Sequence, residues 1–196
     1  MNAPLKPTPS PAFAPAVFTD DEFEDFLGLP GIEKLGRFEL RDGVIYRMNA
    51  QYMPHMRVKM ALVLALQAAI VRAALDFEVG SEGSVRFGGG FMPLPDLFVW
   101  RPVPDAKKTA PGEHVVLAVE VSDSTFKDDH GDKLPRYAKA GLAELWIAEI
   151  PKRTIHLFAD PHEKTYRRAE QVSFGAAFDA LTIPGLRIET EALDRF

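Results

Sequence analysis

The 196-residue sequence contains no cysteine, and this absence excludes several kinds of site at once. Disulfides, zinc–thiolate centres, iron–sulfur clusters and a cysteine nucleophile all require that residue. The sequence also lacks a secretory signal, because its N-terminus is rich in proline and has no apolar core segment. No run reaches the roughly 18 apolar residues needed to cross a bilayer. We therefore predict a cytoplasmic protein with no membrane partner.

Basic residues are in the minority: 23 Lys and Arg stand against 28 Asp and Glu, which gives a net charge of −5. This balance disfavours a strongly basic nucleic-acid binder. It leaves room for a local basic patch, or for a metal ion that neutralises a cluster of acids. With 46% hydrophobic and 26% charged residues, the composition is typical of a globular protein. The length fits one domain of ordinary size.

The distribution of proline divides the chain into a tail and a domain. Residues 1–17 are rich in Pro and Ala and predict a disordered or extended tail. Residues 18–196 are predicted to form a single domain, which begins with a capping box at Thr19 and Glu22. Asp42-Gly43 between two alternating runs predicts a hairpin.

Hydrophobic periodicity predicts an α/β fold with a mixed β-sheet flanked by helices. Apolar residues at helical spacing predict a long helix over 54–75 and a second helix over about 128–139. The run Val115–Val119 is apolar on both faces, so it should be a central, covered strand. Further short strands are predicted at 77–79, 84–87, 96–100, 144–150, 154–160 and 165–172.

Familiar catalytic motifs are missing, but two acids stand in apolar surroundings. There is no P-loop lysine, no G-x-S-x-G elbow and no H-E-x-x-H helix. Asp96 opens an apolar strand, and Glu120 ends another. Carboxylates there are costly unless they are paired, hydrogen-bonded or bound to metal. Two acids on neighbouring strands can share Mg²⁺, which prefers oxygen ligands. In the alternative interpretation, Asp96 caps a turn and Glu120 forms an ion pair with a basic side chain, and no metal is needed to explain the pattern.

A second group of polar residues follows Glu120. Asp129, Lys133 and Tyr137 stand four residues apart and share one helix face, provided that Pro135 does not interrupt the helix. The short connection after Glu120 can bring that face back over the strand end. A lysine beside two metal-bound carboxylates can orient a water and offset phosphate charge. The alternative is an exposed ion pair of small effect.

The order of these motifs carries a family resemblance. Pro95-Asp96, Val119-Glu120-Val121 and Asp129-x3-Lys133-x3-Tyr137-x3-Gly141-x2-Glu144-x-Trp146 together resemble the Uma-two family of restriction-endonuclease-like proteins. That family lies in the PD-(D/E)XK nuclease superfamily. The segment Arg37-Phe38-Glu39-Leu40-x-Asp42-Gly43 resembles its opening hairpin, and His55 resembles its helix-entry histidine. The resemblance covers residues from about 18 to 196.

The resemblance implies a restriction-endonuclease-like sheet and a metal-dependent endonuclease that hydrolyses phosphodiester bonds in DNA. Asp96, Glu120 and the carbonyl of Val121 would hold Mg²⁺, with Mn²⁺ as a substitute, and Lys133 would be the catalytic lysine. The supporting residues would be Glu39, His55, Asp129 and Tyr137. Cleavage of both strands favours a homodimer, because one site cuts one strand.

The sequence departs from the superfamily at one position. The lysine usually stands two residues after the second acid, where this chain has Ser122. The resemblance implies that the lysine has moved to Lys133, and Lys127 is the rival candidate. If neither reaches the acids, the protein is a catalytically inactive nuclease-fold binding or regulatory protein. A glycoside hydrolase that uses two carboxylates is a further alternative, and its activity would survive EDTA.

Overall fold

The computed structural model describes residues 16–104, 106, 108–123 and 129–196. Most of the predicted tail and the rival candidate Lys127 therefore lie outside the described residues. Of Asp129 and His130, only the backbone is described.

A six-stranded sheet forms the centre of the molecule, in the order β10-β9-β8-β7-β5-β3. β7 and β8 are parallel and the other neighbours are antiparallel, so the sheet is mixed as predicted. The strands are β3 (Glu78–Ser81), β5 (Leu97–Trp100), β7 (Val115–Ser122), β8 (Glu144–Glu149), β9 (Thr154–His162) and β10 (Thr165–Ser173). β7 lies inside the sheet and is buried along most of its length, which agrees with its continuous apolar run.

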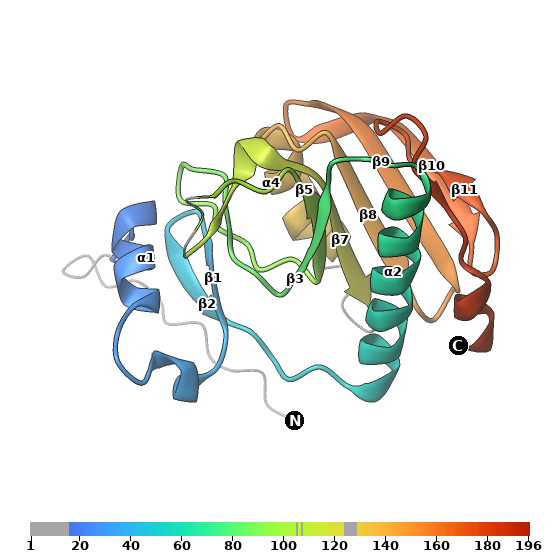
Figure 1. Cartoon of the computed structure of the whole chain (residues 1–196). Coiled ribbons are helices and arrows are strands. Elements are labelled where there is room, and N and C mark those ends of the chain that lie inside the picture. Colours follow the sequence, from blue (N-terminus) through green and yellow to red (C-terminus); the bar gives the residue numbers. More distant parts are fainter. Residues whose placement is uncertain (1–15, 105, 107, 124–128) are drawn as a thin grey trace.

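Helices cover both faces of the sheet (Figure 1). On one face, α2 (Met53–Arg72) packs through Leu62 and Leu66 against Val119 and Trp146. The C-terminal segment completes this layer with β11 (Phe178–Asp179), β12 (Arg187–Ile188) and η4 (Glu191–Arg195). On the other face, α4 (Leu134–Lys139) buries its own apolar residues against the strands. Two separate cores result, one on each side of the sheet.

The predicted long helix ends three residues early and has an apolar exterior. It stops at Arg72 because Ala74 takes a positive φ of 50°, which ends a helix. By length and mean hydropathy alone, α2 is long and apolar enough to cross a membrane. This is weak evidence, because one face of α2 contributes Val58, Leu62 and Leu66 to the core.

The second predicted helix begins in an unusual form. Its first turn, η3 (Asp129–Lys133), is a π-helix, and α4 follows directly. Pro135 stands in the first turn of α4, where a missing N–H costs nothing. Gly141 takes a φ of 77° just beyond the helix, a conformation that suits glycine. Pro135 therefore leaves Lys133 and Tyr137 on continuous helical backbone.

A smaller N-terminal unit packs against the edge of the sheet (Figure 1). It contains α1 (Asp20–Leu27), η1 (Ile32–Leu35), β1 (Phe38–Arg41) and β2 (Val44–Arg47). Thr19 and Glu22 form the predicted capping box. Asp42 and Gly43 both have positive φ, as the predicted hairpin turn requires. Leu40 exchanges two 3.0 Å backbone hydrogen bonds with Met92, which fixes the hairpin beside the sheet. The remaining short elements are β4 (Val85–Arg86), β6 (Ala110–Pro111) and η2 (Gly112–His114).

Candidate active site

The strand register brings the two predicted acids together. Leu97 pairs with Val119 and Phe98 with Ala118, so one further step in this antiparallel register sets Asp96 opposite Glu120. Both side chains point to the α4 face, because side chains two residues apart share a face. They are 7% and 3% exposed. A strand pairing thus creates the acid pair that the sequence motifs indicated.

Asp96 is held by three groups. The Val121 N–H donates to Oδ2 over 2.8 Å, Gln51 Nε2 donates to Oδ1 over 2.7 Å, and His55 Nε2 lies 3.0 Å from Oδ2. Burial raises the pKa of Asp96, but His55, the Val121 N–H and the charge of Lys133 outweigh it and lower the pKa below its ordinary value. Asp96 is therefore a carboxylate at neutral pH.

Glu120 is held by two side chains from the helical segment. Lys133 Nζ donates to Oε2 over 3.0 Å, and the Tyr137 hydroxyl donates to Oε1 over 2.8 Å. Both donors are buried, Lys133 at 5% exposure and Tyr137 at 0%. Burial raises the pKa of Tyr137 well above its ordinary value, and the charge of Glu120 raises it further, so the phenol keeps its proton. As predicted, the helix face that carries Lys133 and Tyr137 lies over the end of β7 that holds Glu120.

Ser122 occupies the position of the usual superfamily lysine. It lies two residues after Glu120, on the same face of β7, and is fully buried. The amino group beside the acids comes instead from Lys133. The side chain of Asp129 and the whole of Lys127 fall outside the described residues.

Glu39 adds a third buried carboxylate. Glu39 alternates with Phe38 and Leu40 on β1, and the structure buries it completely. Oε1 pairs with the Arg41 guanidinium, whereas Oε2 is buried and receives no hydrogen bond from the described residues. The charge of Glu39 also contributes to raising the pKa of Tyr137.

A second layer of polar groups supports Asp96. One member of this layer is Lys59, which is only 6% exposed. Its Nζ donates to Gln51 Oε1 over 2.6 Å and also pairs with Glu82. Glu82 in turn pairs with Arg37 at 2.6 Å. Lys59 therefore holds Gln51 in place beside Asp96.

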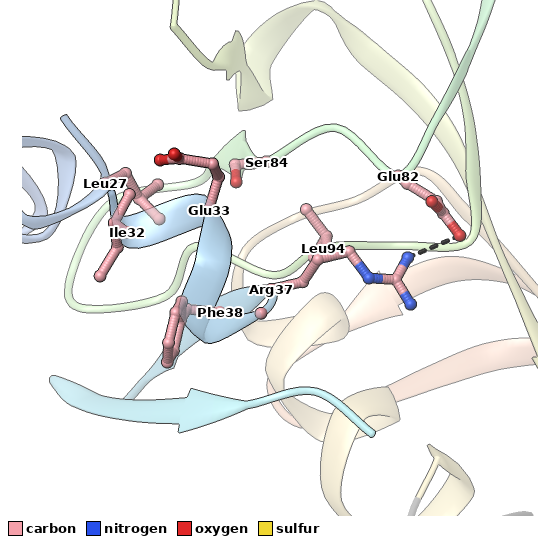
Figure 2. A pocket seen from close by; sticks show the side chains of 9 residues that line it. Leu27, Ile32, Glu33, Arg37, Phe38, Glu82, Ser84 and Leu94 are labelled. Carbon is pink, nitrogen blue, oxygen red and sulfur yellow. Dashed lines mark ion pairs between the residues drawn. The ribbon is translucent and has the colours of Figure 1, made fainter. Parts of the chain in front are cut away.

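An open hollow lies on the outer side of this layer. Figure 2 shows the Arg37–Glu82 ion pair at one end and the apolar side chains of Leu27, Ile32 and Phe38 toward the other. None of the candidate catalytic residues lines it. The hollow is thus separate from the acid–lysine cluster.

Two motif residues serve the fold rather than the site. The buried carboxylate of Glu144 accepts hydrogen bonds from Trp146 Nε1 at 2.6 Å and from Leu181 N at 2.9 Å. It also accepts bonds from the N–H and the hydroxyl of Thr182, at 2.7 and 2.8 Å. Glu144 and Trp146 therefore tie the C-terminal segment to β8. The spacing of the motif alone did not separate them from the acid–lysine cluster.

The acids fit a hard cation that keeps part of its water shell. Within the described ranges, no three acidic or histidine side chains converge as a complete metal cage. Mg²⁺ does not need one, since it is usually held by one or two carboxylates together with waters. Asp96 and Glu120 supply such a pair, and the buried Glu39 Oε2 without a donor is a further oxygen of the right chemistry.

Two comparisons place this fold and site among known proteins. The first is a likeness in fold: the crystal structure of a putative nuclease belonging to DUF820 from Anabaena variabilis matches with a TM-score of 0.64. The two sequences are 17% identical over 90% of this chain and 97% of that chain. This likeness confirms the predicted fold class.

The sequence itself then identifies the family. A family model described as "putative restriction endonuclease" matches residues 23–191, so the chain belongs to the Uma-two family. No curated protein matches the chain. The family match confirms the resemblance drawn from the motifs, and it supports a nuclease function.

Proposed function

We propose that this protein is a metal-dependent phosphodiester hydrolase, a DNase of the restriction-endonuclease type. The observation that carries the proposal is the convergence of Asp96, Glu120 and Lys133 from three separate elements. Lys133 Nζ lies 3.0 Å from Glu120 Oε2, although 13 residues separate them in sequence. Burying two acids and a lysine together is costly for stability alone, and perturbed groups of this kind cluster at functional sites.

In this proposal, Asp96, Glu120 and the Val121 carbonyl would hold Mg²⁺, or Mn²⁺ in its place, with Glu39 as a further candidate carboxylate. A bound ion supplies Lewis acidity to the phosphate and a more acidic water. The hydrogen bonds from Val121, Gln51 and Tyr137 already orient the two acids, so little reorganisation is needed.

Lys133 has two tasks in this scheme. Its ammonium group neutralises Glu120 before substrate arrives, and it offsets the charge that develops on the phosphate during attack. Tyr137 and His55 act as positioning residues, since Tyr137 contacts the carboxylate of Glu120 and His55 contacts that of Asp96. Asp129 remains a supporting candidate on the same segment.

The wider assignment combines the family with the expectations drawn from the sequence. The proposed substrate is DNA, and the proposed working unit is a homodimer with one site for each strand. The proposed location is the cytoplasm, and residues 18–196 are proposed to form the single domain. A nuclease-fold protein without activity is the second candidate. Ser122 at the usual lysine position and the net charge of −5 favour it.

Metal titration with a cleavage assay tests the proposal. Mg²⁺ and Mn²⁺ are titrated by calorimetry into the wild type, an Asp96→Ala/Glu120→Ala variant and a Glu170→Gln control on the exposed strand β10. The same samples are assayed for plasmid nicking with and without EDTA. We expect the wild type and the control to bind and nick, and the double variant to do neither. A wild type that binds metal without nicking any DNA supports the second candidate.

A further inference from the structure

The opening hairpin and the lysine-bearing segment are joined by a reciprocal pair of ion bridges. From the hairpin, Arg41 Nη1 donates to Asp132 Oδ2 over 2.7 Å. From the helical segment, Arg136 Nη2 donates to Asp42 Oδ2 over 2.6 Å. Each element thus contributes one arginine and one aspartate. These contacts link residues more than 90 positions apart in sequence.

The two bridges differ in exposure, although Arg136 also pairs with Asp132 within its own helical segment. The Asp42 side chain is 65% exposed, so its bridge to Arg136 lies in solvent, where ion pairs are weak. The Arg41 side chain is only 17% exposed and has two acidic partners. One is the fully buried Glu39, and the other is Asp132, the residue directly before Lys133.

Arg41 is also fixed by its own surroundings. Its guanidinium lies over the Tyr46 ring, 5.2 Å from the ring centroid, and its Nε is buried without a hydrogen-bond partner among the described residues. Planar guanidinium groups can bridge two carboxylates in a fixed geometry, which a lysine cannot do. Arg41 therefore holds the Glu39 carboxylate and the start of the Lys133 segment in one frame.

We propose that Arg41 is a positioning residue that sets both the third acid, Glu39, and the catalytic lysine, Lys133, so that the N-terminal hairpin is part of the active site. This inference rests on the proposed nuclease function and adds a residue to it. Arg41 does not contact Asp96 or Glu120 in any described interaction, so it acts through Glu39 and Asp132 alone.

Three variants separate positioning from simple docking of the hairpin. Arg41→Gln removes the bridge, and Arg41→Lys restores the charge without the planar fork. Asp42→Asn is the matched control: it removes the acidic charge from the other bridge between the same two elements, and asparagine tolerates the positive φ of 49° at that position. Thermal melting of all three proteins confirms that each is folded.

Two readouts are compared on the full-length proteins. The first is plasmid nicking, with kcat and KM measured separately. We expect Arg41→Gln to lower kcat by at least about tenfold with KM changed less than about twofold, as expected when a misplaced group weakens only the transition state. Arg41→Lys should recover part of kcat, and Asp42→Asn should stay near the wild type.

The second readout does not depend on activity. Acetic anhydride labels accessible lysines, and mass spectrometry reports the rate at Lys133, which is 5% exposed in the wild type. We expect Arg41→Gln to label several-fold faster at Lys133, and Asp42→Asn to match the wild type. Equal labelling in folded Arg41→Gln overturns the inference. A wild type that does not nick, combined with faster labelling in Arg41→Gln, overturns the nuclease proposal and leaves the positioning role intact.

Discussion

The Tyr137 hydroxyl offers a clean test of how tightly the candidate site is built. Tyr137→Phe keeps the aromatic ring, which packs against Phe91 and Phe87 with centroids 5.3 and 5.9 Å away. The substitution removes only the 2.8 Å hydrogen bond to the buried carboxylate of Glu120. Any effect on stability therefore measures that one bond.

The expected cost follows from the charge of the acceptor. A hydrogen bond to a charged group contributes roughly 1.5–3 kcal/mol, and Glu120 keeps Lys133 as a donor, so we expect a loss of about 2 kcal/mol. For a chain of this size, such a loss lowers Tm by about 4–8 °C. Urea unfolding followed by tryptophan fluorescence measures the loss directly, with an unchanged m value.

Tyr166 supplies the matched control. Its hydroxyl is also buried on the α4 side of the sheet, yet it has no hydrogen-bond partner among the described residues. Tyr166→Phe should therefore leave stability unchanged or raise it slightly, because a buried polar group without a partner is removed. If Tyr137→Phe and Tyr166→Phe have equal effects, the bond to Glu120 contributes nothing and the account of the site is wrong.

Three further predictions concern the frame around the site. Glu144→Ala leaves the N–H groups of Leu181, Thr182 and Trp146 without their acceptor, so we expect a loss of at least about 3 kcal/mol in urea unfolding, with faster hydrogen exchange at residues 181–182. Burial raises the pKa of Asp132, but Arg136 and Arg41 outweigh it and lower that pKa, so its contribution to stability is present above the ordinary value of 3.8 and is lost as pH falls through the folded pKa. Acid titration of Asp132→Asn should therefore show a flatter stability profile in that window than the wild type. A Cβ at Gly80 would lie 2.2 Å from the Phe98 ring, so Gly80→Ala should destabilise by about 1–3 kcal/mol, and a neutral result in urea unfolding would contradict the packing of β3 on β5.

Local signals predicted much of this fold, because they depend on neighbours in sequence. The capping box at Thr19 needs only residues three positions apart. The hairpin turn needs only Asp42 and Gly43, which both tolerate positive φ. The continuous apolar run in β7 likewise indicated an interior strand.

The polar support of the site escaped prediction because it depends on contacts that are distant in sequence. Gln51 and Asp96 are 45 residues apart, and Arg41 and Asp132 are 91 apart. Nothing in the local sequence around Gln51 or Arg41 distinguishes them from ordinary surface residues. Glu144 stood in the same motif as Lys133, and only the hydrogen bonds separate its structural role from the acid–lysine cluster.

The central claim is that Lys133 acts as the catalytic lysine, because Ser122 occupies the position where the superfamily usually has that lysine. The most direct measurement is the single-turnover nicking rate of plasmid DNA in Mg²⁺ for the wild type and Lys133→Gln, with exposed Lys139→Gln as the control. We predict cleavage by the wild type and the control, and a loss of at least about a hundredfold in Lys133→Gln. Nicking by folded Lys133→Gln at the wild-type rate would contradict the claim.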